Sequence, residues 1–142
     1  MLLLLTFAIN APKILLIKTF LIMNAVLSLG KYLFAIPFAV FGIFHFMKTE
    51  GMAGMAFGQS ALVYLTGVAL IAAAVSMLIG KLDKLAAVLL ALMLIIFVLA
   101  IHLGGAMDGD QSAMSAMLKD IMLAGAALIY ARSEAKDASV IG

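Results

Sequence analysis

The chain has 142 residues, of which 67% are hydrophobic and 11% are charged, and its formal net charge is +2. Its mean hydropathy of +1.28 excludes an ordinary soluble domain, because a short chain has too much surface to bury so many apolar side chains. The absence of cysteine excludes disulfides, iron–sulfur ligation and covalent haem attachment by this chain. The sequence therefore predicts an all-α integral membrane protein with one small domain.

The first 22 residues are an N-terminal extension that does not fit a spanning helix. The segment "MLLLLTFAINAPK" lacks the basic start of a signal peptide, and Lys18 interrupts the apolar run that follows it. No turn separates this run from the next apolar segment, so both cannot cross the membrane. The extension is either an interfacial cytoplasmic helix or a stretch upstream of a natural start at Met23, and the second interpretation is favoured.

Four apolar segments follow, each close to the roughly 20 residues that a spanning helix needs. Their short connections indicate an up-down four-helix bundle, with residues 48–59 and 104–112 as loops and 133–142 as a polar tail. Asp110 or Ser112 is expected to cap the last helix. The predicted spans are about 27–47, 60–80, 85–103 and 114–131.

Stripes of small residues predict the faces on which these helices pack, because close approach in lipid needs small side chains. Each stripe follows the spacing of one helix face. The stripes are Ala35, Ala39 and Gly42; Ala69, Ala73, Ser76 and Gly80; and Asp120, Ala124, Ala127 and Ala131.

The nine basic residues predict the orientation. With four spans, seven of them fall on one side, which the positive-inside rule assigns to the cytoplasm, together with both termini. The basic residues are thereby explained without a nucleic-acid partner. The seven are Lys13, Lys18, Lys31, Lys81, Lys84, Arg132 and Lys136, and the other two are Lys48 and Lys119.

Four polar side chains lie in or at the rim of the predicted spans at one level near the outer face: His45, His102, Lys119 and Asp120. Neighbouring residues on a helix point about 100° apart, so Lys119 and Asp120 are not expected to pair with each other. Asp120 is expected to bond to the imidazole of His45 or His102, and Lys119 to loop carbonyls or headgroups. Intramembrane ionisable groups are rare and mark functional sites.

An aromatic stripe of Phe34, Phe38 and Phe41 ends at His45 with helical spacing. A flat, apolar, redox-active ring such as a quinone head suits this surface, with imidazole and lysine as hydrogen-bond partners for its oxygens. The predicted quinone or partner site therefore comprises His45, His102, Lys119, Asp120 and Phe41. The simpler interpretation is that the phenylalanines face lipid and His45 is an interfacial cap.

Two metal-based alternatives follow from the same residues. The two histidines could ligate a b-type haem, but both lie at helix ends and no second pair exists. Thioethers beside imidazoles suit Cu(I), although methionine is also a common apolar filler. The copper alternative uses His45, Met47, Met52, Met55, His102 and Met107. No motif supports a hydrolase or a nucleotide enzyme, and catalytic residues are not assigned.

From about residue 29 to 132 the chain resembles the DoxX family of small bacterial membrane proteins. The residues that carry the resemblance are "LGKYLFAIPFAVFGIFHF", "GKLDKLAAVLLAL", "FVLAIH" and "MLKDIMLAGAALIYA". The resemblance implies a four-helix inner-membrane protein, and it places the polar family positions on His45, His102, Lys119 and Asp120.

Relatives in that family are linked to thiosulfate:quinone oxidoreductase and to membrane complexes that handle oxidative or thiol stress. The resemblance therefore implies a subunit of a quinone-linked or redox-protective complex, with a periplasmic or membrane redox partner. Because the chain has no cysteine, any thiol chemistry must come from that partner. The alternative is a non-catalytic membrane subunit that anchors a partner protein.

Overall fold

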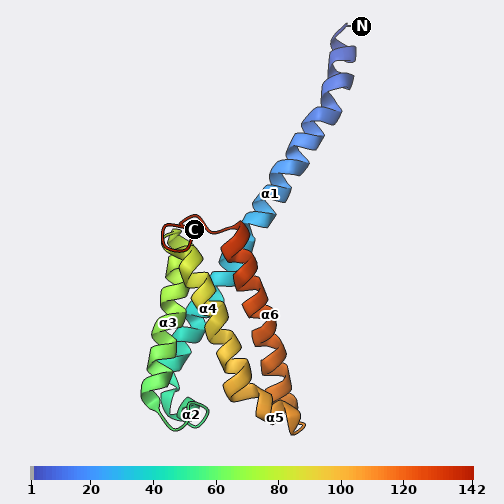
Figure 1. The fold of residues 1–142 in the computed structure, drawn as a ribbon. Helices are drawn as coiled ribbons and strands as arrows, with labels where there is room; N and C mark the ends of the chain where they lie inside the picture. The colour runs from blue at the N-terminus through green and yellow to red at the C-terminus, as the bar shows by residue number, and fades with distance from the viewer. Residues whose placement is uncertain (1) are drawn as a thin grey trace.

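The computed structural model describes the backbone of residues 2–142 and the side chains of residues 15–142. This part of the chain is helical and contains no strand. Figure 1 shows the long helices running side by side, with short helices at one end. The elements are α1 (Leu2–Met47), α2 (Thr49–Ala53), α3 (Ser60–Ile79), α4 (Asp83–Phe97), η1 (Val98–His102, a π-helical turn), α5 (Leu103–Met107) and α6 (Gln111–Ser133).

Four helical segments are long and apolar enough to cross a membrane, which supports a multi-pass membrane protein. They overlap the four spans predicted from hydropathy. Both loop predictions were wrong in part, because α2 and α5 occupy residues that were expected to lie in loops. The third span is therefore longer than predicted, since α4, η1 and α5 form one continuous helical segment. The four segments are Leu15–Met47, Ser60–Ile79, Asp83–Met107 and Gln111–Ser133.

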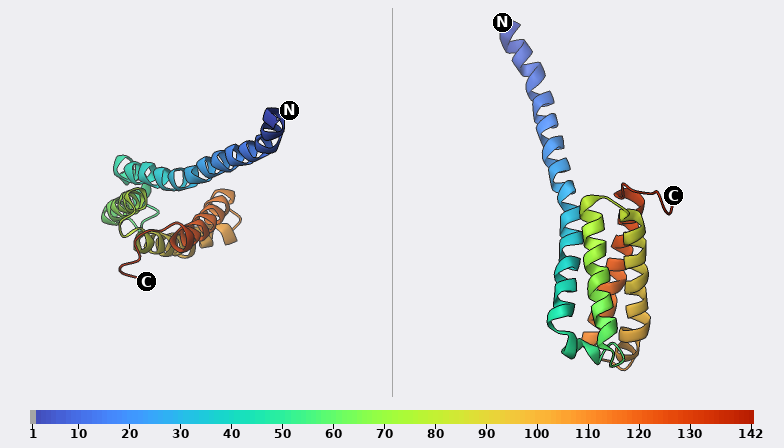
Figure 2. Two further views of the ribbon diagram at one scale, coloured as in Figure 1. Left: turned by 90° about the horizontal axis from the view of Figure 1, so that it is seen from above. Right: turned by 90° about the vertical axis from the view of Figure 1, so that its left-hand side faces the viewer.

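Helix α1 is much longer than the others, with 46 residues and a length of about 69 Å at 1.5 Å per residue. A bilayer core is only about 30 Å thick. Figure 2 shows the N-terminal part of α1 projecting past the rest of the bundle. The part packed on α3 begins near Lys31, whose Nζ donates a hydrogen bond to the Leu78 carbonyl at 3.0 Å. The helix continues unbroken through residue 22, the predicted boundary between the N-terminal extension and the first span.

The helices pack mainly as two pairs, α1 with α3 and α4 with α6, and α3 also contacts α4. The first pair is closest at Gly42 and Gly67. A Cβ atom added to Gly42 would lie 2.8 Å from the Gly67 carbonyl oxygen, and one added to Gly67 would lie 3.0 Å from the Gly42 oxygen. Only glycine allows the two backbones this approach. Gly42 belongs to a predicted small-residue stripe, whereas Gly67 was missed.

The core confirms the small-residue faces in α6 and, partly, in the other helices. Asp120, Ala124, Ala127 and Ala131 are all buried. In α1 and α3, Ala35 and Ala73 are buried, and Ala39, Ala69 and Ser76 are half-buried. The predicted cap of α6 is also confirmed, since the Asp110 carboxylate accepts hydrogen bonds from the Ser112 and Ala113 amides at 2.8 and 3.3 Å.

One end of the bundle, here the turn end, is held by a buried carboxylate. Asp83 is fully buried and accepts hydrogen bonds from the Lys84 amide at 3.0 Å and from the Tyr130 hydroxyl at 3.2 Å. The amides of Lys136 and Asp137 donate to the same carboxylate, each at 2.9 Å. The C-terminal tail is thereby fastened over the start of α4, and no pattern in the sequence predicts this attachment.

The tail also binds the turn between α3 and α4 directly. The Asp137 carboxylate accepts a hydrogen bond from the Leu82 amide at 2.9 Å, and this bond lowers the pKa of Asp137 to about 2. Leu82 has a φ of +52° and Gly80 has a φ of +71°, so the turn needs the left-handed region at two positions. Figure 1 shows the C-terminus lying beside this turn.

Candidate functional site

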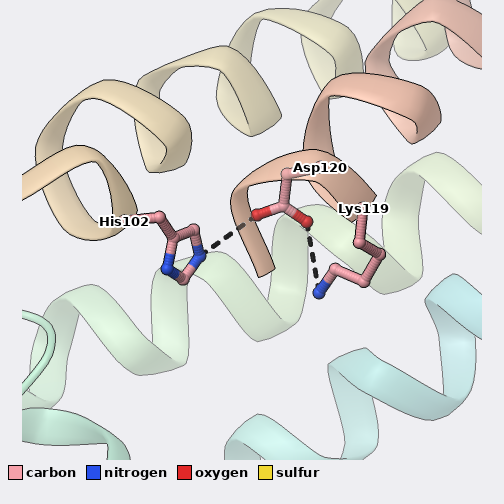
Figure 3. Close-up of polar contacts among 3 residues, drawn as sticks. All are labelled: His102, Lys119 and Asp120. Atoms are coloured by element: carbon pink, nitrogen blue, oxygen red, sulfur yellow. Dashed lines mark ion pairs between the residues drawn. The ribbon is translucent and has the colours of Figure 1, made fainter. Parts of the chain in front are cut away.

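At the other end of the bundle, a π-helical turn places His102 next to α6. The turn covers Val98–His102 and joins α4 to α5. A π-turn adds a residue to the helix and changes the direction in which later side chains point, and such turns are frequent at functional sites. The result is that the imidazole of His102 is directed at α6, as Figure 3 shows.

Asp120 is the centre of the polar cluster, defined here as His102, Lys119 and Asp120. Asp120 is only 3% exposed. One carboxylate oxygen, Oδ2, lies 3.2 Å from His102 Nε2, and the other, Oδ1, lies 3.2 Å from Lys119 Nζ (Figure 3). Of the two histidines offered by the sequence, the structure pairs His102 with Asp120. A buried carboxylate needs such partners, because an unpaired charge is strongly unfavourable inside a membrane.

The prediction that Lys119 and Asp120 do not pair was wrong. Their Cβ atoms do point in different directions on α6, but a lysine side chain is long and flexible enough to curl back to its neighbour. The ammonium of Lys119 also lies 5.4 Å from the centroid of the Phe41 ring on α1, which is within cation–π range. It contacts Phe41 and Asp120 in place of the suggested loop carbonyls, and the suggested contact with headgroups stays a prediction.

The contact between Lys119 and Phe41 defines the α1–α6 seam. The side chain of Lys119 is 48% exposed and Phe41 is 44% exposed. Both residues belong to segments that are long and apolar enough to span a membrane. At the turn end, α1 and α6 meet again through the stacked rings of Phe34 and Tyr130, whose centroids are 6.2 Å apart.

The ammonium of Lys119 lies well away from the N-terminal end of α6. Lys119 comes eight residues after Gln111, the first residue of α6, which corresponds to a rise of about 12 Å. Phe41 likewise comes six residues before Met47, the last residue of α1, which corresponds to about 9 Å. The two helices thus bring a cation and an aromatic ring together, each more than one helical turn from the end of its helix.

His45 was predicted to belong to the same cluster, but its contacts lie elsewhere. Its Nδ1 lies 2.7 Å from the Phe41 carbonyl oxygen, one turn earlier in α1. Its Cβ lies against α3, 3.0 Å from where a Cβ on Gly67 would be. Its carbonyl accepts a hydrogen bond from Thr49 at 2.7 Å. His45 therefore fixes the end of α1 against α3, and it reaches the cluster only through the backbone of Phe41.

The predicted aromatic stripe does not form one exposed surface. Phe38 is 3% exposed and belongs to the core, where Phe34 packs against it edge-on with ring centroids 5.2 Å apart. Only Phe41 of the three phenylalanines lies at the cluster. A flat ligand at this site would therefore meet one aromatic ring and one ammonium, and not a row of rings.

The arrangement of these side chains offers few ligands for a metal ion. Among residues 15–142, no three His, Asp or Glu side chains gather in a way that could hold a metal ion. Met47, Met55 and Met107 of the copper alternative are 71%, 55% and 78% exposed. The thioether and imidazole site for Cu(I) stays a prediction from the sequence.

The chain matches no protein-family model, no curated protein and no solved structure. The resemblance to the DoxX family thus stays a prediction, and the functional argument depends on the cluster itself.

Proposed function

We propose that this chain is a DoxX-like subunit of a quinone-linked or redox-protective complex in the bacterial inner membrane. In this proposal the helices form an up-down bundle with both termini in the cytoplasm. The basic residues support that orientation, because five of them lie at the turn end or in the tail, and cytoplasmic loops carry an excess of Lys and Arg. The five are Lys31, Lys81, Lys84, Arg132 and Lys136.

The observation that carries the proposal is the half-exposed side chain of Lys119, whose ammonium lies over Phe41 at the α1–α6 seam. An ammonium has three donors, and Asp120 Oδ1 accounts for one of them. The remaining donors are available to a ligand oxygen that approaches from the bilayer. Phe41 supplies a ring against which a flat ligand can stack.

A quinone head fits these groups better than a phospholipid head does. The ammonium lies about 12 Å along α6 from its first residue, at a depth where a charged phosphate would have to leave the headgroup layer. A quinone ring is neutral and apolar and dissolves in the hydrocarbon, while its two carbonyl oxygens accept hydrogen bonds. The seam therefore favours a ligand that is delivered by the membrane.

The proposal is tested by measuring the affinity of the purified protein in nanodiscs for decyl-ubiquinone. We expect saturable binding by the unaltered protein and much weaker binding by Lys119→Gln. Lys48→Gln serves as the matched control, because Lys48 is an exposed lysine outside the cluster.

A second candidate function is a non-catalytic anchor for a partner protein. It is favoured by one observation, namely that both oxygens of Asp120 already have partners within the chain. Under this alternative the cluster only joins η1 to α6. Substitutions in it would then lower the thermal stability of the protein without changing the affinity for any ligand.

A further inference from the structure

The Asp120 carboxylate connects two groups with different surroundings. Lys119, on its Oδ1 side, is half exposed at the α1–α6 seam. His102, on its Oδ2 side, belongs to η1, and its side chain is 18% exposed. Helix α5 begins directly after His102 and ends at Met107, which is 78% exposed. A Cβ added to Gly104 would meet nothing within 4 Å, so the surface next to His102 is open on the α5 side.

We propose that Lys119, Asp120 and His102 form a proton relay between a quinone oxygen at the seam and water at the α5 end of the bundle. The inference rests on the proposed quinone function. The two oxygens of one buried carboxylate give the relay its continuity, because each lies 3.2 Å from a nitrogen that can carry a proton.

The relay supplies one of the two protons that a quinone takes up when it receives two electrons from a redox centre of the partner protein. An N–H bond of the Lys119 ammonium breaks, an O–H bond forms on the reduced quinone oxygen, and Lys119 is left as a neutral amine. The imidazolium of His102 then gives its Nε2 proton to Oδ2 of Asp120. A half-turn of the carboxyl group about Cβ–Cγ brings this proton to Lys119 Nζ, and water reprotonates His102.

Few other charged groups of the described chain approach this path. Helix α3 carries no charged residue, and α5 carries none. On α4, the charged residues are Asp83 and Lys84 at the turn end, and on α1 the titratable group at this level is His45, which contacts the Phe41 carbonyl. The remaining charged groups at this end of the bundle lie at or beyond the helix ends, namely Lys48, Glu50, Asp108 and Asp110.

The relay is tested by protein-film voltammetry on nanodiscs that contain the full chain and decyl-ubiquinone. The separation of the reduction and oxidation peaks with increasing scan rate gives the rate of proton-coupled reduction of the bound quinone. General acid–base groups typically contribute about 10²- to 10⁴-fold to such steps, so we expect His102→Ala and Asp120→Asn to slow the rate at least tenfold. Added imidazole is expected to restore the rate in His102→Ala and to leave the unaltered protein unchanged.

Each outcome separates the relay from the binding proposal. Slow reduction in His102→Ala that imidazole restores supports the relay, since a purely structural role would not be rescued. Normal quinone affinity with a rate within twofold of the unaltered protein overturns the relay alone, and so does a slow rate that imidazole does not restore. If the unaltered protein does not bind decyl-ubiquinone, the proposed function and the relay both fail.

Discussion

His102 Nε2 and Asp120 Oδ2 lie 3.2 Å apart, and this pair joins the π-helical turn of the third candidate span to the middle of the fourth. The pair also fixes the second carboxylate oxygen, which holds Lys119 at the α1–α6 seam. The side chains thus form a chain of contacts from η1 through α6 to Phe41 on α1. Stability and ligand binding should both depend on it.

Replacing Asp120 by alanine should destabilise the protein, because it leaves the Lys119 ammonium and the His102 imidazole without their shared carboxylate. A hydrogen bond to a charged group is worth about 1.5–3 kcal/mol, and the loss should lie at the low end of this range because the remaining Lys119 side chain is half exposed. The free energy of unfolding by SDS in mixed micelles measures the change. Asp108→Ala, at an exposed position, is the control, and equal stability of the two variants would contradict the role of Asp120.

Replacing Asp83 by alanine should release the C-terminal tail from the turn end. The tail amides of Lys136 and Asp137 donate to Asp83, so both lose their acceptor. Limited trypsin digestion should then cleave after Lys136 at least several times faster than in the unaltered protein. Unchanged cleavage in Asp83→Ala would refute the tail attachment.

Tyr130→Phe should lose about 1 kcal/mol of stability, because it removes one hydrogen bond to Asp83. Tyr32→Phe, at an exposed position, is the control.

The contact between Asp137 and Leu82 should depend on pH in the acid range. Hydrogen bonding from the Leu82 amide lowers the pKa of Asp137 from its ordinary 3.8 to about 2, so the ionised carboxylate favours the folded tail. This contribution is fully present above about pH 4, and it is lost as the pH falls through about 2. The Leu82 amide resonance should titrate with a midpoint near 2 and should stop titrating in Asp137→Asn. A midpoint near 4 would disagree with the contact.

Gly42→Ala should loosen the packing of α1 against α3. The added Cβ would lie 2.8 Å from the Gly67 carbonyl oxygen, and a backbone atom cannot move aside without shifting a helix. Overpacking of this kind typically costs about 1–3 kcal/mol. At Gly125, where an added Cβ meets nothing within 4 Å, the same substitution should be neutral or stabilising because alanine favours helix. Equal effects at the two positions would argue against the close contact.

Hydropathy predicts most of the fold, because length and apolar character alone decide which segments can cross a bilayer. Capping chemistry predicts the start of α6 at Asp110, and the spacing of small residues predicts its buried face. The continuity of α1 through residue 22 was missed, since a single lysine in an apolar run does not break a helix. Helix α1 projects beyond the bundle because α3, the helix on which it packs, is much shorter. This packing cannot be read from the sequence.

Three of the four residues predicted for the cluster belong to it, and their contacts were predicted only in part. Chain direction brings His102, Lys119 and Asp120 to one level, and this can be worked out from the spans. The choice of His102 over His45 depends on the π-helical turn at Val98–His102, which has no recognisable pattern in the sequence. Pairing between Lys119 and Asp120 depends on a side-chain rotamer, which backbone geometry cannot give. The Asp83 network joins residues more than 50 positions apart, so local patterns cannot reveal it.

The most direct test of the account is the affinity for decyl-ubiquinone of the full chain in nanodiscs, compared between the unaltered protein, Lys119→Gln and Lys48→Gln. A hydrogen bond to a charged group is worth about 1.5–3 kcal/mol, so the Kd of Lys119→Gln should rise at least tenfold while that of Lys48→Gln stays within twofold. Identical affinities of all three proteins, or no saturable binding by the unaltered protein, would contradict a quinone site at the α1–α6 seam.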